Sequence, residues 1–264
     1  MSEIFQRTQY LIGQEMVEKL SKKKVILFGV GGVGGFVAEA LARGGIGGID
    51  LVDKDTVSES NINRQIIALH STIGRYKTEV MAERLRDINP AIKVNIYSMF
   101  FLPETASQID FSRYDYVIDA VDTVAAKIEI IVRAKQAGVP VISAMGAGNK
   151  LDPTKFVVTD IYKTEMCPLA KVMRHEMKKR NIKDLKVVYS TEKAIKPLTD
   201  EDMLVDDKKE YSDTVDKMQN SDSDAGGNNR RQKIVGSISF VPSVAGLLIA
   251  GEVIKDIIKS DTIK

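Results

Sequence analysis

Cysteine is scarce in this sequence, and its scarcity excludes several kinds of site. A single cysteine, Cys167, occurs in 264 residues, so no intramolecular disulfide can form. A structural zinc site built from paired Cys-x-x-Cys motifs is excluded for the same reason. The composition fits a reducing cytoplasm. Because a lone cysteine usually serves ordinary packing, we expect Cys167 to be structural and not a nucleophile.

A net charge is also nearly absent. The chain has 38 basic and 36 acidic side chains, so its overall charge points to no class of partner, and only local asymmetry can do so. The clearest asymmetry lies in residues 163–186, where eight Lys and Arg residues face three acidic ones and no aromatic residue is interleaved. A solvated helix face and an RNA-binding surface both fit this segment, and both interpretations stay open.

Long apolar runs are rare as well. The first 24 residues have mixed charge and lack the apolar core of a secretory signal. Residues 234–251 form an uncharged stretch of borderline membrane-spanning length, but Pro242 divides it into a β-like half and a helical half that continues into charged residues. We therefore expect a buried strand followed by a packed helix, and membrane contact is not expected.

The most informative stretch that is present runs from residue 24 to residue 55. An apolar run of strand length at 25–30 ends in a glycine cluster, which precedes an amphipathic run at 36–43. Gly29, Gly31 and Gly34 have the G-x-G-x-x-G spacing, and Gly32 lies between them. Such a strand, tight turn and helix bring bare backbone N–H groups up to a phosphate. The motif predicts a nucleotide site without identifying the nucleotide.

Polar residues follow where a nucleotide site needs them. A strand at 49–52 ends at Asp53, about twenty residues beyond Gly34, where a carboxylate can accept hydrogen bonds from ribose hydroxyls. The next segment should leave the carboxyl edge of the sheet, where doubly wound folds bind ligands. Its polar residues are Asp55, Asn61, Arg64, Gln65, Arg75 and Lys77. Two or more of these cations could neutralise a triphosphate, although each taken singly could be an ordinary solvated residue.

Strands and helices continue to alternate up to about residue 150. Further strands are predicted at 92–97, 114–120 and 139–144, with helices at 77–88 and 123–137. The strand at 114–120 ends in two carboxylates, of which Asp119 suits a turn and Asp122 is better placed to reach metal or phosphate. This alternation predicts an α/β fold that is Rossmann-like and doubly wound, with a mostly parallel sheet and a C-terminal strand and helix extension.

We expect one domain over residues 1–264. Its nucleotide-binding core would cover 1–150, and a substrate-side and dimer-side extension would cover 151–264. The extension would include a mobile acidic insertion near 199–232, which is poor in large apolar residues. At the other end of the chain, residues 3–20 predict one helix or two short ones, in which Arg7 would by itself be a solvated arginine.

Taken in order, the motifs GVGGVGG, LVDKD, NINRQ, Lys77 and DAVD resemble the adenylating domain of the ThiF, MoeB and HesA superfamily, which is related to ubiquitin-activating enzymes. The resemblance implies that the glycine loop binds ATP, that the acid matching Asp53 holds the ribose and that cations grip the phosphates. With the polar segment above, the predicted cofactor-binding residues are Gly29, Gly31, Gly32, Gly34, Asp53, Asp55, Asn61, Arg64 and Lys77.

The same resemblance assigns catalytic roles. Arg64 and Lys77 would stabilise charge on the phosphates, and Asp122 would work with magnesium as its protein ligand. Arg7 matches an arginine that the partner subunit inserts into the active site in the homodimers of the family. The predicted catalytic residues are therefore Arg64, Lys77, Asp122 and Arg7, with ATP and Mg²⁺ as cofactors and a homodimer as the assembly.

The second half of the chain narrows the resemblance. Residues 147–182, 187–197 and 235–254 are similar to a bacterial branch of the family that dehydrates threonylcarbamoyladenosine in tRNA. Cys167 departs from the pattern, because related sequences tend to carry Asp before Pro168, and the acidic insertion is a second departure. The branch implies that ATP adenylates the threonine carboxylate of the modified tRNA. The neighbouring carbamoyl group would then close on it and expel AMP, without an enzyme nucleophile.

Three other functions remain open from the sequence. An adenylating enzyme for a ubiquitin-like sulfur carrier, of the thiamine or molybdopterin type, is the main alternative, although such relatives commonly carry the zinc cysteines that are missing here. A non-catalytic nucleotide-binding scaffold or sulfur-relay adaptor is the second, and an NAD-dependent oxidoreductase is the third. A sulfur-relay or cysteine desulfurase partner also stays open beside the tRNA.

Overall fold

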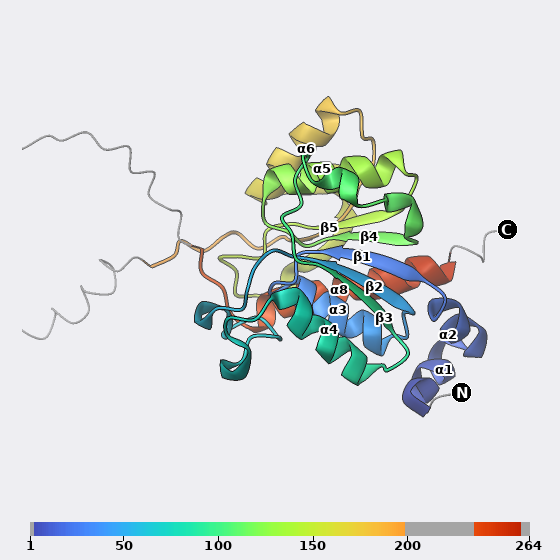
Figure 1. Ribbon diagram of the computed structural model, residues 1–264. Helices are drawn as coiled ribbons and strands as arrows, with labels where there is room; N and C mark the ends of the chain where they lie inside the picture. Colours follow the sequence, from blue (N-terminus) through green and yellow to red (C-terminus); the bar gives the residue numbers. More distant parts are fainter. Residues whose placement is uncertain (1–2, 199–234, 260–264) are drawn as a thin grey trace, which may run out of the picture.

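The computed structural model of the protein describes residues 3–198 and 235–259. These residues form a seven-stranded sheet with the order β3-β2-β1-β4-β5-β7-β6 (Figure 1). The strands are β1 (Lys24–Phe28), β2 (Gly48–Val52), β3 (Lys93–Tyr97), β4 (Tyr116–Asp119), β5 (Val141–Ala144), β6 (Phe156–Asp160) and β7 (Lys186–Ser190). All neighbouring pairs are parallel except β6 and β7. The predicted doubly wound, mostly parallel α/β fold is therefore confirmed.

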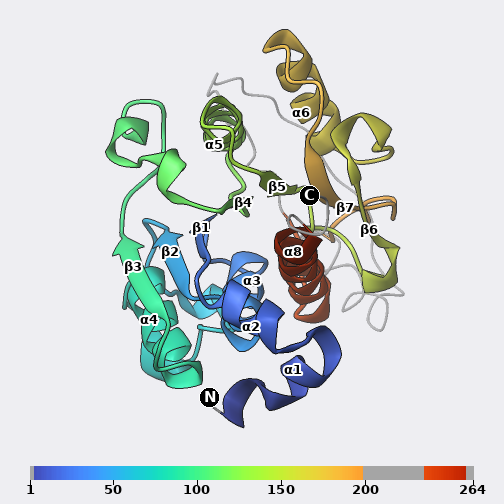
Figure 2. The same ribbon diagram turned by 90° about the vertical axis from the view of Figure 1, so that its right-hand side faces the viewer.

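Helices cover both faces of this sheet. The α-helices are α1 (Gln6–Ile12), α2 (Gln14–Leu20), α3 (Gly34–Arg43), α4 (Lys77–Ile88), α5 (Val124–Gln136), α6 (Pro168–Lys179) and α8 (Phe240–Lys259). Short 3-10 helices are η1 (Glu3–Phe5), η2 (Glu59–Asn61), η3 (His70–Thr72), η4 (Ala106–Gln108), η5 (Phe111–Arg113), η6 (Pro153–Lys155) and η7 (Ile161–Lys163). Helices α3, α4 and α8 lie on one face, and α5 and α6 lie on the other (Figures 1 and 2).

The central strands are apolar throughout because both of their faces are covered. In β1, the residues from Val25 to Phe28 are all fully buried. Side chains of alternate residues therefore enter two separate cores. Leu27 belongs to the core beneath α3 and α8, whereas Phe28 belongs to the core beneath α5 and α6. In the second core the Phe28 ring lies 4.6 Å from the ring of Phe101, centroid to centroid.

The C-terminal helix is held in the fold by both packing and polar contacts. A Cβ at Gly246 would lie 2.4 Å from the carbonyl oxygen of Val33, so only glycine allows α8 to approach the start of α3 so closely. Asp256 accepts hydrogen bonds from the Tyr116 hydroxyl of β4 and from Lys186 Nζ of β7, each at 2.7 Å. The packed helix predicted for this region is confirmed. Within the described ranges no helix has the length and apolarity needed to cross a bilayer.

The prediction of a buried strand immediately before this helix is wrong. Residues 235–238 have no regular secondary structure, and α8 begins at Phe240, with Pro242 in its first turn, where a missing N–H costs no helical hydrogen bond. Val235 is 62% exposed and not buried. Two strands that the sequence analysis missed, β6 and β7, extend the sheet instead. Residue 234 and the acidic insertion near 199–232 lie outside the described residues.

Candidate active site

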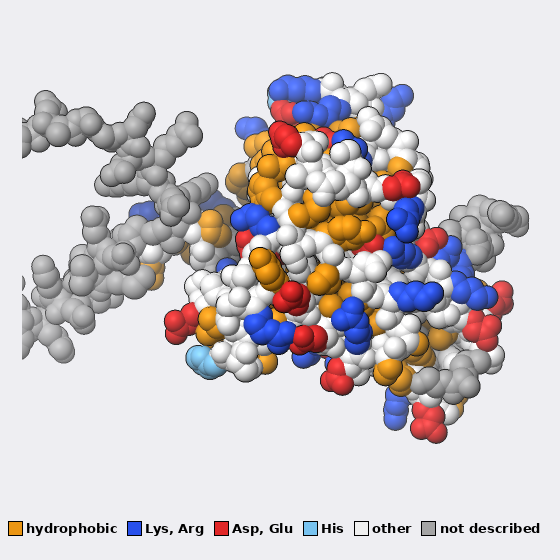
Figure 3. Space-filling view, in the orientation of Figure 1, with side chains coloured by type: hydrophobic (Ala, Val, Ile, Leu, Met, Phe, Trp, Pro, Cys, Tyr) orange, Lys and Arg blue, Asp and Glu red, His pale blue; other side chains and the backbone are white. Residues whose placement is uncertain are grey.

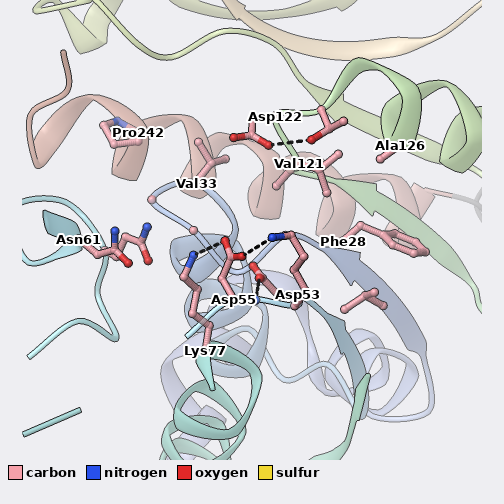
Figure 4. Close-up of a pocket in the computed structure, with 18 of the residues that line it drawn as sticks. Phe28, Val33, Asp53, Asp55, Asn61, Lys77, Val121, Asp122, Ala126 and Pro242 are labelled. Atoms are coloured by element: carbon pink, nitrogen blue, oxygen red, sulfur yellow. Dashed lines mark hydrogen bonds and ion pairs between the residues drawn. The ribbon is translucent and has the colours of Figure 1, made fainter. Parts of the chain in front are cut away.

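The sheet has one topological switch point, between β1 and β4, where the strand order reverses. Loops that leave the carboxyl ends of such strands diverge, and ligands of open α/β sheets bind in the resulting crevice. A cavity of about 780 Å³ lies there (Figure 4). This volume falls within the range of small-molecule and cofactor sites. Its lining includes Phe28, Gly31, Gly32, Asp53, Lys54, Asp55, Asn61, Arg64, Gln65, Lys77, Val121, Asp122, Gly148, Val235, Ser237 and Pro242.

The glycines between β1 and α3 divide into two kinds. Gly29 has φ 88°, and a Cβ on it would lie 2.7 Å from the carbonyl oxygen of Ala120; a Cβ on Gly34 would lie 1.8 Å from the carbonyl oxygen of Gly29. These two glycines are required for the turn itself. A Cβ on Gly31 would meet no atom closer than 3.9 Å, so a side chain there would occupy the cavity. Together with Gly32, it forms a cradle of bare backbone at the N-terminus of α3, which suits a phosphate.

Asp53 fixes this cradle to the end of β2. Its Oδ2 accepts a hydrogen bond from the backbone N–H of Val30 at 2.7 Å, and its Oδ1 accepts one from the N–H of Asp55 at 2.9 Å. An ionised carboxylate has about four acceptor positions. Asp53 lines the cavity, so it retains positions for the hydroxyls of a ribose.

Lys77 begins α4 and carries a buried ammonium group to the cavity. Its side chain is only 8% exposed, and Nζ lies 3.1 Å from Oδ2 of Asp55. Lys54 Nζ lies 3.0 Å from the other oxygen of the same carboxylate (Figure 4). Burial alone would raise the pKa of Asp55, but hydrogen bonds from Lys54 and Lys77 hold this pKa below its usual value. Asp55 is therefore ionised at neutral pH and keeps two cations at the mouth of the cavity.

Arg64 and Asn61 come from the loop that follows β2. Asn61 Oδ1 accepts from the backbone N–H of Ser58 at 3.2 Å and shapes the loop. Arg64 Nη1 donates to the Ser60 carbonyl and to Asn63 Oδ1, each at 2.9 Å. A guanidinium has five N–H donors, so these contacts leave donors for an anion in the cavity that Arg64 lines.

Asp122 lies on the loop that leaves β4, and its exposed side chain lines the same cavity (Figure 4). Its Oδ1 accepts from the Thr123 hydroxyl at 3.3 Å. No group of three or more His, Cys, Asp or Glu side chains suited to a metal ion occurs within residues 3–198 and 235–259. The carboxylate of Asp122 fits magnesium that arrives with a nucleotide, because Mg²⁺ is usually held by one or two carboxylates together with substrate phosphates.

Arg7 is not part of this cavity. It lies exposed on α1, and α1 is at the end of the sheet opposite to the loops that form the site (Figure 1). Of the predicted cofactor-binding and catalytic residues, all except Gly34 and Arg7 therefore line this cavity, and Gly34 packs against Gly29 within the turn. A role for Arg7 in the site of a partner subunit stays a prediction.

Residues 235–242 form one wall of the cavity, which the sequence did not indicate. Asn149, in the left-handed region with φ 58°, donates its backbone N–H to the Gly236 carbonyl at 2.8 Å and accepts the Gly236 N–H on Oδ1 at 2.6 Å. Asn63 Nδ2 donates to the Ser237 carbonyl at 3.0 Å. The ring of Pro242 lies 3.3 Å from the position of a Cβ on Gly32. Segments from three distant parts of the chain thus meet beside the glycine cradle.

A second feature that sequence analysis missed is a buried ion pair beneath the site. Lys127 of α5 is fully buried, and its Nζ donates to Asp119 Oδ2 at 3.0 Å and to the Ala144 carbonyl at 2.6 Å. Ser143 Oγ donates to the same Asp119 oxygen. The pair links the ends of β4 and β5, from which the loops at 120–123 and 145–149 enter the site. Asp119 also accepts the N–H of Val121 at 3.2 Å, which confirms its predicted role in the turn.

Lys127→Met is expected to lower the free energy of unfolding by about 3–5 kcal/mol, because it leaves the buried carboxylate of Asp119 without its partner. Urea denaturation of the purified protein measures this change. Lys135→Met is the matched control on the same helix, because Lys135 pairs with Asp184, whose side chain is 76% exposed. The control should change stability by less than about 1 kcal/mol. Equal stability of the two variants would show that the buried pair contributes little.

The crevice, the glycine cradle and the acidic and basic side chains around it have the features of a nucleotide-binding site. The chain belongs to the ThiF family, whose model matches residues 5–264.

The chain is similar to named relatives over nearly its whole length. The chain is 42% identical over 261 residues to the tRNA threonylcarbamoyladenosine dehydratase of Bacillus subtilis (strain 168). The aligned region covers 98% of this chain and 96% of the relative. The crystal structure of the E. coli dehydratase, TcdA, in complex with ATP is 30% identical, with a TM-score of 0.80, and covers 98% of this chain and 96% of that one. Its complex with AMP gives a TM-score of 0.82 at 31% identity, covering 99% and 96%.

Proposed function

We propose that this protein is an ATP-dependent tRNA threonylcarbamoyladenosine dehydratase that works through a carboxyl-adenylate. The observation that carries the proposal is the convergence of the bare glycine cradle with Lys77, Arg64 and Asp122 on one cavity. This arrangement suits a nucleoside triphosphate, because backbone N–H groups and cations can hold its phosphates. Similarity to the dehydratases over nearly the whole chain supplies the substrate class.

In the first step, a threonine carboxylate oxygen attacks the α-phosphorus of ATP, and pyrophosphate leaves. The Gly31 and Gly32 backbone and the cations Arg64 and Lys77 would stabilise the negative charge that develops on the phosphates. Asp53 would hold the ribose hydroxyls. Asp122 would hold the magnesium ion that accompanies ATP, and such an ion would offset further phosphate charge.

In the second step, the carbamoyl group of the same side chain attacks the activated carbonyl carbon and expels AMP. Both groups belong to one molecule, so holding them side by side supplies much of the rate enhancement without an enzyme nucleophile. Cys167 is not needed as a nucleophile, and we expect it to serve packing. It is 5% exposed, and its Sγ accepts the Ala170 N–H at 3.5 Å at the start of α6.

A tRNA substrate would also explain the basic segment at residues 163–186. It would place the protein in the cytoplasm. Lys and Arg side chains gather over α6, at the top of the view in Figure 3. Lys171 and Lys178 are exposed there, whereas Lys179 and Arg180 pair with Glu176. Exposed lysines favour contact with phosphate backbone and not base readout. A solvated helix face fits these contacts too, so the surface stays a prediction.

Pyrophosphate release from ATP by the purified full chain tests the function. We expect stimulation by tRNA that carries threonylcarbamoyladenosine, together with loss of 18 mass units from that nucleoside, which corresponds to one water. The control substrate is the same tRNA without the threonylcarbamoyl group. Stimulation by a carrier protein ending in Gly-Gly, with none by the modified tRNA, would instead establish the sulfur-carrier alternative.

We also propose a homodimer in which Arg7 completes the site of the partner subunit. If so, Arg7→Ala and Lys77→Met, each inactive alone, should complement each other when their subunits exchange. Half of the dimers would be mixed, and each mixed dimer would have one intact site, so about a quarter of wild-type activity should return. The unmixed variants are the controls, and light scattering measures the assembly. No recovery in demonstrably mixed dimers would contradict a role in trans.

A further inference from the structure

Residues 235–238, the part of the cavity wall that precedes α8, are held in place by two asparagines. The segment has no regular secondary structure and is mostly exposed. Asn149 forms two hydrogen bonds with Gly236, at 2.8 Å and 2.6 Å. Asn63 Nδ2 donates to the Ser237 carbonyl at 3.0 Å. Because so few hydrogen bonds hold this exposed segment, its local opening should cost little free energy.

The side chain of Asn63 also binds Arg64. Its Oδ1 accepts a hydrogen bond from Arg64 Nη1 at 2.9 Å, so one carboxamide joins the guanidinium to the wall. A guanidinium only donates hydrogen bonds and a backbone carbonyl only accepts them, so the two ends of an amide suit these two partners. A carboxylate in the same place would have no donor for Ser237.

Arg64 and the wall lie on either side of the same glycine. Arg64 Cγ is 3.5 Å from the position that a Cβ on Gly32 would take, and the ring of Pro242 is 3.3 Å from that position. The hydrogen bonds of Arg64 to Ser60 and Asn63 both use Nη1, so the N–H groups on Nε and Nη2 remain for an anion. A phosphate on the glycine cradle would therefore lie beside both the guanidinium and the wall.

We propose that Asn63 is a positioning residue that couples Arg64 to the wall, so that bound ATP and the closed wall stabilise each other. A phosphate bound by Arg64 fixes the guanidinium and thereby the Asn63 carboxamide, which then keeps its hydrogen bond to Ser237. The coupling is reciprocal, because a closed wall must favour phosphate binding by the same factor. This inference rests on the proposed function, since it requires ATP in the cavity.

Hydrogen–deuterium exchange of the backbone amides at 235–240 tests the coupling, measured by mass spectrometry on the full chain with and without saturating ATP. In the wild-type protein, ATP should slow this exchange at least about tenfold. Asn63→Ala should reduce the slowing to less than about threefold and should raise the Kd for ATP about tenfold, because the two effects are linked. The melting temperature should stay close to that of wild type, because both hydrogen bonds of Asn63 are exposed.

Asn149→Gly is the matched control. It removes the other side-chain hydrogen bond to the wall, and glycine tolerates the φ of 58° at this position. The wall amides should exchange faster in this variant, but ATP should still slow them at least about tenfold, with a Kd within about threefold of wild type. Asn63→Asp keeps an acceptor for Arg64 and lacks the donor for Ser237, so it should lose the ATP-dependent slowing as Asn63→Ala does.

Three results would overturn the inference. Wild-type slowing in Asn63→Ala or Asn63→Asp would show that ATP orders the wall by direct contact. Loss of the slowing in Asn149→Gly would show that any weakening of the wall has this effect. A wild-type protein that binds ATP without slower exchange of the wall would show that the two are not coupled. If wild-type protein bound no ATP, the proposed function would fail instead, which is a distinguishable outcome.

Discussion

Lys77→Met is expected to lower the rate of pyrophosphate release by about 10²–10³-fold, as the loss of one preorganised charge donor at a reacting centre commonly does. The Lys77 ammonium is held at the cavity by a side chain that is 8% exposed, so it is poorly screened by water and fixed before the nucleotide binds. Initial rates at saturating ATP and modified tRNA measure the effect. The melting temperature should fall only slightly, because Asp55 is half exposed and can be hydrated.

Lys54 provides the comparison for this variant. It contacts the same carboxylate of Asp55, but its side chain is 52% exposed. Since exposed ion pairs are screened by solvent and salt, Lys54→Met should reduce the rate by less than about tenfold. A rate for Lys77→Met within threefold of wild type would contradict the assignment of Lys77 to the phosphates.

Gly31→Ala is expected to impair ATP binding, whereas Gly34→Ala is expected to impair folding. A Cβ on Gly34 would lie 1.8 Å from the Gly29 carbonyl oxygen, so the turn must move, and we expect a loss of about 3 kcal/mol or more in unfolding free energy. A Cβ on Gly31 meets open space, so that variant should fold normally but weaken ATP binding by at least about tenfold, or about 1.4 kcal/mol. Urea denaturation and calorimetric titration with ATP separate the two effects.

The opposite pattern would overturn the description of the cradle. If Gly31→Ala bound ATP like wild type, the phosphates would lie elsewhere in the cavity. If Gly34→Ala were as stable as wild type, the turn between β1 and α3 would have room that its geometry does not indicate.

Elements that are determined by residues close together in the sequence could be predicted from local patterns. The helix expected at 77–88 matches α4 (Lys77–Ile88), because its apolar residues recur at helical spacing and Pro90 prevents continuation. The first strand and the glycine turn were equally predictable, since steric requirements at Gly29 and Gly34 leave a mark in the sequence.

The remaining features depend on partners that are far away in the chain. Residues 235–238 belong to a stretch with a β-like composition, but their backbone hydrogen bonds go to Asn149 and Asn63, so they form a cavity wall instead. Lys127 is a lysine within a helix, which normally points to solvent, and only the fold places it beside Asp119.

The wall at 235–242 also bears on how the protein is made. The cradle that it covers lies before residue 35, whereas the wall and α8 lie about 200 residues later in the sequence. During synthesis, the sheet can therefore assemble while the surface of α3 that packs on α8 is still bare and apolar. A nascent chain could therefore enclose a nucleotide only after α8 has left the ribosome.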